Sequence, residues 1–156
     1  MKILMVCLGN ICRSPIADGL LRKKVKEHGL AVEVDSAGTS AYHVGNKPDE
    51  RMCKTAESFG TPIDFLRARQ FTVRDFDAFD IIYAMDQSNY NNITALARNE
   101  KDKSKVNLFL NELYPNENKA VPDPYFGGEQ GFIDVYKMVD ATTDQIIEKL
   151  KTNRLS

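Results

Sequence analysis

The sequence is short of cysteine, of net charge and of long hydrophobic runs, and each shortage excludes a class of protein. It has three cysteines in 156 residues, an odd number that argues against the disulfide framework of a secreted protein. A net charge of -1 lacks the basic excess of a general nucleic-acid binder. No apolar run approaches the roughly 20 residues that span a bilayer, and the first residues do not form a signal-peptide pattern. We therefore expect a cytoplasmic protein without nucleic-acid or membrane partners.

What the sequence does contain fits one α/β domain. With 42% hydrophobic residues, the chain 1–156 is long enough to bury one core without disulfides or a structural metal. Apolar runs and helical periodicity predict strands at 2–6, 32–36, 79–85 and 106–109, and helices at 15–28, 48–59, 87–98 and 128–150. Strands that alternate with helices indicate a three-layer α/β fold, a mainly parallel sheet with helices on both faces.

The most unusual stretch is VCLGNICRSP, residues 6–15, in the first predicted turn from strand to helix. It lacks both GxGxxG and the GK[ST] of a Walker loop, so it is not a nucleotide-binding fingerprint. Gly9 and Asn10 tolerate positive φ angles, which lets successive backbone amides converge on an anion. Ser14 is expected to cap the helix and Pro15 to take its first position. The predicted phosphate-binding residues are Leu8, Gly9, Asn10, Ile11, Cys12 and Arg13.

Cys7 and Arg13 stand six positions apart around this loop. A cysteine beside an arginine and a helix N-terminus is stabilised as the nucleophilic thiolate. The thiolate would attack the phosphorus of a bound phosphate while the planar fork of Arg13 binds two oxygens, and Ser14 is predicted to donate to the sulfur. One alternative is that Cys7 only packs in the core. Another is a zinc site, for which His28 and His43 lack ligand spacing.

A candidate proton donor lies in VPDPYFGG, residues 121–128. Asp123 stands between two prolines, which hold it in an extended conformation suited to presenting a carboxyl group. Tyr125 and Phe126 are predicted to form an aromatic wall that favours an aromatic leaving group. The alternative is that Asp123 is only a turn residue and that the aromatic side chains, including Tyr42, pack on the surface.

Six motifs follow one another along the chain: CLGNICRS (7–14), DSAGT (35–39), YHVGNKPDERM (42–52), ARQ (68–70), AMDQSN (84–89) and DPYF (123–126). In this order they resemble the low-molecular-weight protein tyrosine phosphatases over essentially the whole chain. The resemblance implies a four-stranded parallel sheet of order 2-1-3-4. It also implies that Cys7 is the nucleophile, Arg13 the phosphate-binding arginine and Asp123 the general acid, then base.

The resemblance further implies that Asn10 is left-handed and held by a polar network with Ser36 and Ser14. By the same resemblance, Leu8, Tyr42 and Tyr125 line a deep slot for phosphotyrosine. The implied reaction is hydrolysis of phosphotyrosine on proteins through a cysteinyl phosphate. We expect a monomer that acts on tyrosine-phosphorylated proteins without a metal or cofactor.

The same fold has three alternative activities: phosphoarginine phosphatase, arsenate reductase and phosphotyrosine binding without catalysis. Related phosphoarginine phosphatases carry threonine where this chain has Ile11, so isoleucine favours phosphotyrosine. Arsenate reductases need further redox cysteines downstream, and here only Cys53 follows. A catalytically idle phosphotyrosine-binding module would be expected to lose Cys7, Arg13 or Asp123, and all three are present.

Cys12 and Leu66 carry two further expectations. Cys12 either fills space or forms a reversible disulfide that protects Cys7 from over-oxidation, as the resemblance also suggests. Leu66 replaces a histidine that relatives often carry, so the hydrogen-bond support of Asn10 is expected to be rearranged.

Overall fold

The structure is a computed structural model and describes residues 1–124 and 128–155. Its strands are β1 (Lys2–Cys7), β2 (Glu33–Gly38), β3 (Ile81–Ala84) and β4 (Val106–Leu108). Its helices are α1 (Arg13–Glu27), α2 (Glu50–Ser58), α3 (Asp75–Ala78), α4 (Gln87–Thr94), α5 (Glu100–Ser104), the 3-10 helix η1 (Phe109–Glu112) and α6 (Glu129–Lys151). None of the helices described is long and apolar enough to cross a membrane.

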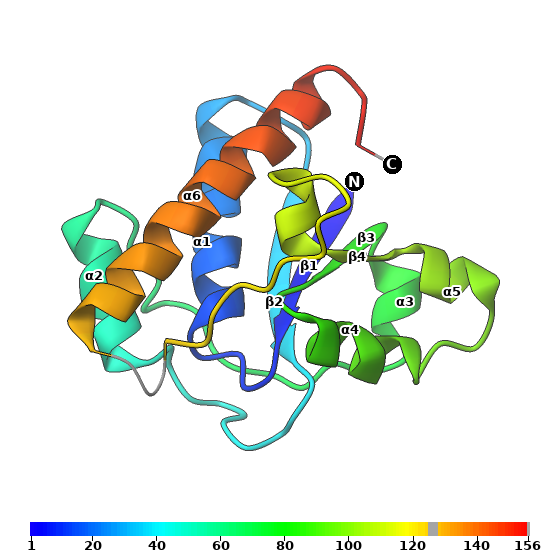
Figure 1. Ribbon diagram of the computed structural model, residues 1–156, viewed down its shortest axis with the longest axis horizontal. Helices are drawn as coiled ribbons and strands as arrows, with labels where there is room; N and C mark the ends of the chain where they lie inside the picture. The colour runs from blue at the N-terminus through cyan, green and yellow to red at the C-terminus, as the bar shows by residue number, and fades with distance from the viewer. Residues whose placement is uncertain (125–127, 156) are drawn as a thin grey trace.

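The four strands form one parallel sheet of order β2-β1-β3-β4. The predicted 2-1-3-4 order and three-layer α/β architecture are confirmed. Figure 1 shows α1, α2 and α6 on one side of the sheet, with α3, α4 and α5 on the other. The chain moves in one direction from β1 to β2 and in the other direction to β3 and β4. Because β-α-β crossovers are right-handed as a rule, this reversal places helices on both faces.

The central strand β1 explains why the core has two halves. Successive side chains of a strand point to opposite faces, so Ile3 and Met5 pack with α1 and α6, whereas Leu4 and Val6 pack with α3 and α4. All four side chains are fully buried. A strand covered on both faces reads as a continuous apolar run, which is why it was predictable from the sequence.

Every predicted strand and helix is present, but several boundaries differ. α1 begins at Arg13 rather than at residue 15, and α4 ends at Thr94 rather than near residue 98. The helices α3 and α5 and the 3-10 turn η1 were not predicted, because four or five residues are too few to show a helical period.

The carboxyl ends of the inner strands meet at one edge of the sheet. Cys7 pairs in register with Gly38, and Val6 pairs with Ala84. The loop after β1 therefore lies between the ends of β2 and β3. This is the edge at which parallel α/β sheets bind ligands.

Candidate active site

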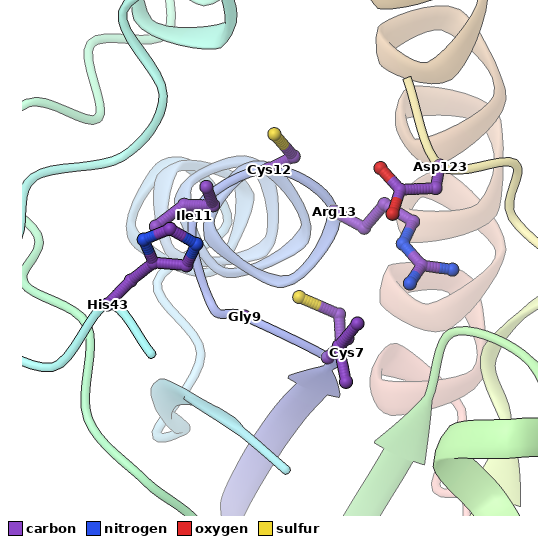
Figure 2. Close-up of a pocket in the computed structure, with 8 residues that line it drawn as sticks. Cys7, Gly9, Ile11, Cys12, Arg13, His43 and Asp123 are labelled. Carbon is purple, nitrogen blue, oxygen red and sulfur yellow. The ribbon is translucent and has the colours of Figure 1, made fainter. Parts of the chain in front are cut away.

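The loop between β1 and α1 wraps one side of a pocket of about 190 Å³. The residues that line the pocket are Cys7, Leu8, Gly9, Ile11, Cys12, Arg13, His43 and Asp123. Figure 2 shows Arg13 and Asp123 on one side of Cys7 and His43 on the other. The structure thus brings the predicted nucleophile, phosphate-binding arginine and proton donor to one cavity.

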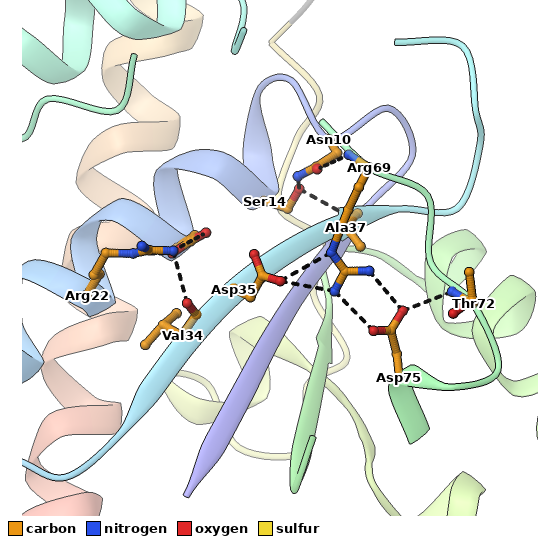
Figure 3. A network of polar contacts seen from close by, with 10 residues as sticks. Asn10, Ser14, Arg22, Val34, Asp35, Ala37, Arg69, Thr72 and Asp75 are labelled. Carbon is orange, nitrogen blue, oxygen red and sulfur yellow. Dashed lines mark hydrogen bonds and ion pairs between the residues drawn. The ribbon is translucent and has the colours of Figure 1, made fainter. Parts of the chain in front are cut away.

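Asn10 shapes the loop. Its φ of 57° is left-handed, as predicted, and its backbone N-H lies 3.3 Å from Sγ of Cys7. Its side-chain Nδ2 donates to Oγ of Ser14 at 2.8 Å, and its Oδ1 accepts from the backbone N-H of Arg69 at 3.0 Å (Figure 3). Asn10 therefore fixes both the turn of the backbone and the direction of the Ser14 hydroxyl.

Ser14 stands directly beside the sulfur. Its Oγ lies 3.0 Å from Sγ of Cys7 and 3.4 Å from the carbonyl oxygen of Ala37. Because Ser14 accepts from Asn10, its own proton is available to the sulfur or to that carbonyl. An O-H that can point at sulfur stabilises a negative charge there.

The predicted capping role of Ser14 was wrong. The N-cap of α1 is Cys12, without a side-chain cap hydrogen bond, and Ser14 lies inside the helix with its Oγ turned to Cys7 and Asn10. Pro15 is the third helical residue rather than the first. Proline is tolerated there because the first turn of a helix has no intrahelical partner for its N-H groups.

Arg13 is held at the opposite end of the loop and is only 4% exposed. Its Nη1 donates to a carboxylate oxygen of Asp86 at 2.7 Å and to the carbonyl oxygen of Val121 at 3.0 Å. Nη1 donates both of these hydrogen bonds, which are the ones Arg13 makes to the described residues. The N-H groups of Nε and Nη2 can therefore donate to a ligand. Burial alone would lower the pKa of Arg13, but the negative charges of Cys7 and Asp86 raise it overall.

Asp86 also caps α4. Its Oδ1 accepts from the backbone N-H of Asn89 at 2.8 Å while its Oδ2 binds Arg13. One carboxylate thus joins the end of β3 to the arginine of the pocket. The loop that carries Asp123 is pinned to the same strand end, because the N-H of Val121 donates to the carbonyl oxygen of Met85 at 2.8 Å.

Gly38 is required where β2 passes beneath the loop. A Cβ at this position would lie 2.8 Å from the carbonyl oxygen of Leu8 and 3.1 Å from the carbonyl carbon of Gly9. Any other residue would push the loop away from the sheet. The glycine of the DSAGT motif therefore has a packing reason that is visible only in three dimensions.

Cys12 is buried and lines the pocket with Cys7. Burial, reinforced by the negative charges of Asp49 and Cys7, raises the pKa of the Cys12 thiol well above its usual range. Cys12 is consequently a neutral thiol in the reduced protein, and all three cysteines are free. Over residues 1–124 and 128–155, no group of three or more His, Cys, Asp or Glu side chains is arranged to hold a metal ion.

The family model described as low molecular weight phosphotyrosine protein phosphatase matches residues 2–155. The chain belongs to this family of phosphatases. The family of the phosphatase was thus correctly predicted from its motifs, and its members are hydrolases.

Individual relatives agree over almost the whole length of the phosphatase. The low molecular weight phosphotyrosine protein phosphatase of Schizosaccharomyces pombe is 43% identical over 143 residues, which cover 89% of this chain and 90% of the relative. A protein tyrosine phosphatase from Entamoeba histolytica superposes with a TM-score of 0.92 at 39% identity, covering 99% of both chains. An arginine phosphatase from Drosophila superposes with a TM-score of 0.89 at 31% identity, covering 97% of this chain and 98% of the other.

The structure of the phosphatase describes two of the four residues of the predicted substrate wall, Leu8 and Tyr42. Leu8 lines the pocket and is 45% exposed, whereas Tyr42 is 83% exposed and is not among the pocket-lining residues. Tyr125 and Phe126 lie outside the described residues. The wall formed by Tyr42, Tyr125 and Phe126 stays a prediction.

The support of Asn10 differs from the predicted network. Its side chain binds Ser14, as predicted, and the backbone of Arg69. Ser36 is buried, and its hydroxyl acts on Asp18 of α1, where it opposes the rise that burial causes in the pKa of the carboxyl group. Leu66 is buried in the apolar core, so the hydrogen bond to Oδ1 of Asn10 comes from a backbone N-H instead of a nearby side chain.

Sequence reasoning missed His43 as a residue of the pocket. A Cβ on Gly9 would lie 3.0 Å from Cδ2 of His43, so the imidazole packs directly on the loop of the phosphatase. His43 follows the predicted wall residue Tyr42, and a loop gives no periodicity from which to tell which of two neighbours faces inward. No signal in the sequence could have made this choice.

Proposed function

We propose that the protein hydrolyses phosphotyrosine on proteins through a cysteinyl-phosphate intermediate. The observation that carries the proposal is that Cys7, Arg13 and Asp123 line one pocket. The side chains have the three roles that the reaction requires: a nucleophile, a binder of phosphate oxygens, and a proton donor.

In the first step, the Cys7 thiolate attacks phosphorus in line with the leaving tyrosine oxygen. The S-P bond forms as the P-O bond breaks, and Asp123 gives its proton to the departing phenoxide. Arg13 and the amides of the loop bind the non-bridging phosphate oxygens, whose charge they stabilise. The products of this step are a cysteinyl phosphate and the substrate protein with its tyrosine side chain dephosphorylated.

In the second step, water attacks the cysteinyl phosphate. Asp123, now ionised, takes a proton from the water, and the S-P bond breaks to release inorganic phosphate. The leaving sulfur regains the negative charge, which the Ser14 hydroxyl at 3.0 Å can stabilise. The cycle needs no electron transfer, and we propose that it needs neither a metal nor a cofactor.

The choice of phosphotyrosine over phosphoarginine rests on Ile11. Its side chain lines the pocket, so an apolar surface rather than a hydroxyl faces the group next to phosphorus. An aryl ring gains from apolar contact, whereas a guanidinium group needs hydrogen-bond partners. Because the similar Drosophila protein is an arginine phosphatase, phosphoarginine is the substrate against which this choice must be tested.

The test compares initial rates on p-nitrophenyl phosphate, a phosphotyrosine peptide and a phosphoarginine peptide, with and without a chelator. We expect hydrolysis of the first two substrates, little of the third, no effect of chelator, and no turnover by Cys7→Ser. Turnover by Cys7→Ser would contradict the nucleophile, and loss of activity with chelator would indicate metal chemistry. Turnover of arsenate with a thiol reductant would indicate the reductase instead.

We further propose that the protein acts as a cytoplasmic monomer on tyrosine-phosphorylated proteins. An open pocket beside exposed loop residues such as Leu8 suits a side chain presented by a protein surface. Sedimentation of the purified protein tests the monomer, and a single species at the monomer mass is expected.

A further inference from the structure

A second cavity of about 460 Å³ lies between α2 and the first turns of α6. Figure 1 shows these two segments side by side, next to the loop that begins α1. Phe132 is fully buried at this groove, Ile133 of α6 also lines it, and the ring of Phe59 is 43% exposed. Phe59 is also fixed in place, because it stacks on Tyr136 at a centroid distance of 4.5 Å. The groove thus offers a rigid apolar surface.

The α2 side of the groove carries two cationic side chains, of which Arg51 is paired with Asp49 at 3.1 Å. Arg51 and Lys54 line it against a single carboxylate, Glu129. The guanidinium of Arg51 lies 4.7 Å from the ring centroid of Phe132 and is oriented by Asp49. Lys54 is exposed and forms no ion pair with any carboxylate of the described residues. A ligand that suits this groove combines a large apolar side chain with a neighbouring acidic one.

The start of α2 contacts the wall of the active-site pocket, and the same helix lines the groove. The backbone N-H of Asp49 donates to the carbonyl oxygen of Ile11 at 2.7 Å, and Ile11 lines the pocket. Asp49 is also the N-cap of α2, so the helix that carries Arg51 and Lys54 starts at the wall of the pocket. A chain whose phosphotyrosine enters the pocket therefore passes close to the groove.

We propose that the groove between α2 and α6 binds the segment of the phosphoprotein substrate that flanks the phosphotyrosine, and that it selects acidic and large apolar residues there. The proposal rests on the proposed phosphatase function. It names the class of substrate: phosphotyrosine followed or preceded by an acidic, apolar segment. The rim contact with Lys54 is expected to act through KM more than through kcat, because it is remote from the reacting atoms.

The experiment compares kcat/KM for matched phosphotyrosine peptides and for p-nitrophenyl phosphate. One peptide carries leucine and two glutamates beside the phosphotyrosine, its partner carries leucine and two glutamines, and a third carries serine for the leucine with the glutamates kept. Each is made with the flank on either side. In the wild type we expect the acidic peptide to be favoured about two- to fivefold, the range of an exposed ion pair. Lys54→Glu should abolish or reverse this preference, leaving p-nitrophenyl phosphate hydrolysis unchanged.

Two further variants separate charge, apolar contact and fold. Lys101→Glu makes the same change of charge on α5, on the other side of the sheet, and should keep the wild-type preference. Ile133→Ser should lower kcat/KM for the leucine peptides and leave the serine peptide unchanged.

The outcomes distinguish this proposal from the proposed function. If the wild type hydrolyses p-nitrophenyl phosphate but Lys54→Glu and Lys101→Glu alter the peptide preference equally, the groove proposal is wrong and the phosphatase stands. If Lys54→Glu leaves the preference intact and changes only the sedimentation of the protein, the groove is instead a contact between copies. If the wild type hydrolyses no phosphate ester, the proposed function itself is wrong.

Discussion

At the scale of single residues, the hydroxyl of Ser14 is the polar group that stands beside the sulfur of Cys7. Its Oγ accepts from Nδ2 of Asn10 at 2.8 Å and lies 3.0 Å from Sγ. The accepted bond leaves the hydroxyl proton to point at the sulfur or at the carbonyl oxygen of Ala37. In the proposed reaction this proton would stabilise the negative charge of the sulfur before attack and after release of phosphate.

Asp123 carries the first residue-scale prediction. Asp123→Ala should lower kcat by about 10² to 10⁴-fold for phosphotyrosine, whose leaving oxygen needs a proton. The loss should be much smaller in the first step for aryl phosphates with acidic phenols, because those leave without protonation. Burst kinetics across a series of phenols measures this dependence. An equal loss for every leaving group would contradict the role of general acid.

Cys12 carries the second residue-scale prediction. Peroxide should convert the Cys7 thiolate to a sulfenic acid, and the Cys12 thiol should then displace water to form a disulfide. Dithiothreitol should restore activity to the wild type but less completely to Cys12→Ser, in which Cys7 oxidises further. Recovery is measured after matched exposure to peroxide. Equal recovery by both proteins would leave Cys12 only the role of packing.

Residues of the site could be predicted from the sequence where a short motif contains them. Cys7, Arg13 and Asp123 were predicted to share a site because a cysteine, an arginine and a proline-flanked acid stand in recognisable motifs, and the three residues line one pocket. His43 and the backbone N-H of Arg69 that supports Asn10 were not found, because both depend on which parts of distant loops come together. A sequence pattern records what a residue can do, whereas its partner is set by the fold.

At the scale of elements, α1 is joined to the sheet through Arg22, which forms a half-buried ion pair with Asp18. Asp18 has no exposed surface, and Arg22 binds both of its carboxylate oxygens, at 3.0 and 3.2 Å. Arg22 also donates to the carbonyl oxygen of Val34 on β2 at 2.9 Å (Figure 3). Burial raises the pKa of Asp18 to about 6, against the opposing effects of Arg22 and of the Ser36 hydroxyl, and the nearby charge of Asp35 adds to the rise.

This pKa gives an element-scale prediction. The folded-state pKa lies above that of the unfolded chain, about 3.9, so the protonated carboxyl favours folding. Its contribution is present below about pH 4 and is lost as the pH rises through about 6, a loss of ~3 kcal/mol. Urea unfolding from pH 4 to pH 7.5 should therefore show the wild type losing stability relative to Asp18→Asn. Asp134→Asn, on the exposed face of α6, serves as the matched control and should follow the wild type. Parallel profiles for the wild type and Asp18→Asn would contradict the assignment.

One of the elements missed from the sequence, α3, is held in part by a distant partner. α3 is a single turn, and Asp75 within it binds the guanidinium of Arg69 at 3.0 and 3.1 Å, while Arg69 also binds Asp35 of β2 at 3.1 Å (Figure 3). Such a turn has little helical preference of its own. Its position follows from ion pairs between residues far apart in the chain, which no local pattern reveals.

At the scale of the whole molecule, one sheet separates two apolar clusters that share its strands. Residues of β1 and β3 contribute to both clusters, so neither half has a sheet of its own. We predict that residues 1–156 form one domain that unfolds in a single thermal transition. Two separate transitions by calorimetry would contradict this.

Phosphate should stabilise the whole molecule through the pocket. At ten times its dissociation constant, phosphate adds about 1.4 kcal/mol, which for a chain of this length raises Tm by roughly 3 to 6 °C. Arg13→Lys, which loses the bidentate fork, should remove most of this shift. An equal shift in both proteins would place the anion elsewhere.

Direct detection of the phosphoenzyme tests the central claim most closely. Asp123→Ala, which lacks the base for hydrolysis of the intermediate, is mixed with an aryl phosphate whose phenol needs no proton, quenched in acid within the first turnover, digested and examined by mass spectrometry. We predict one phosphoryl group on the peptide that contains Cys7, absent from Cys7→Ser. A phosphoryl group on another residue, or steady turnover with none on Cys7, would contradict the account.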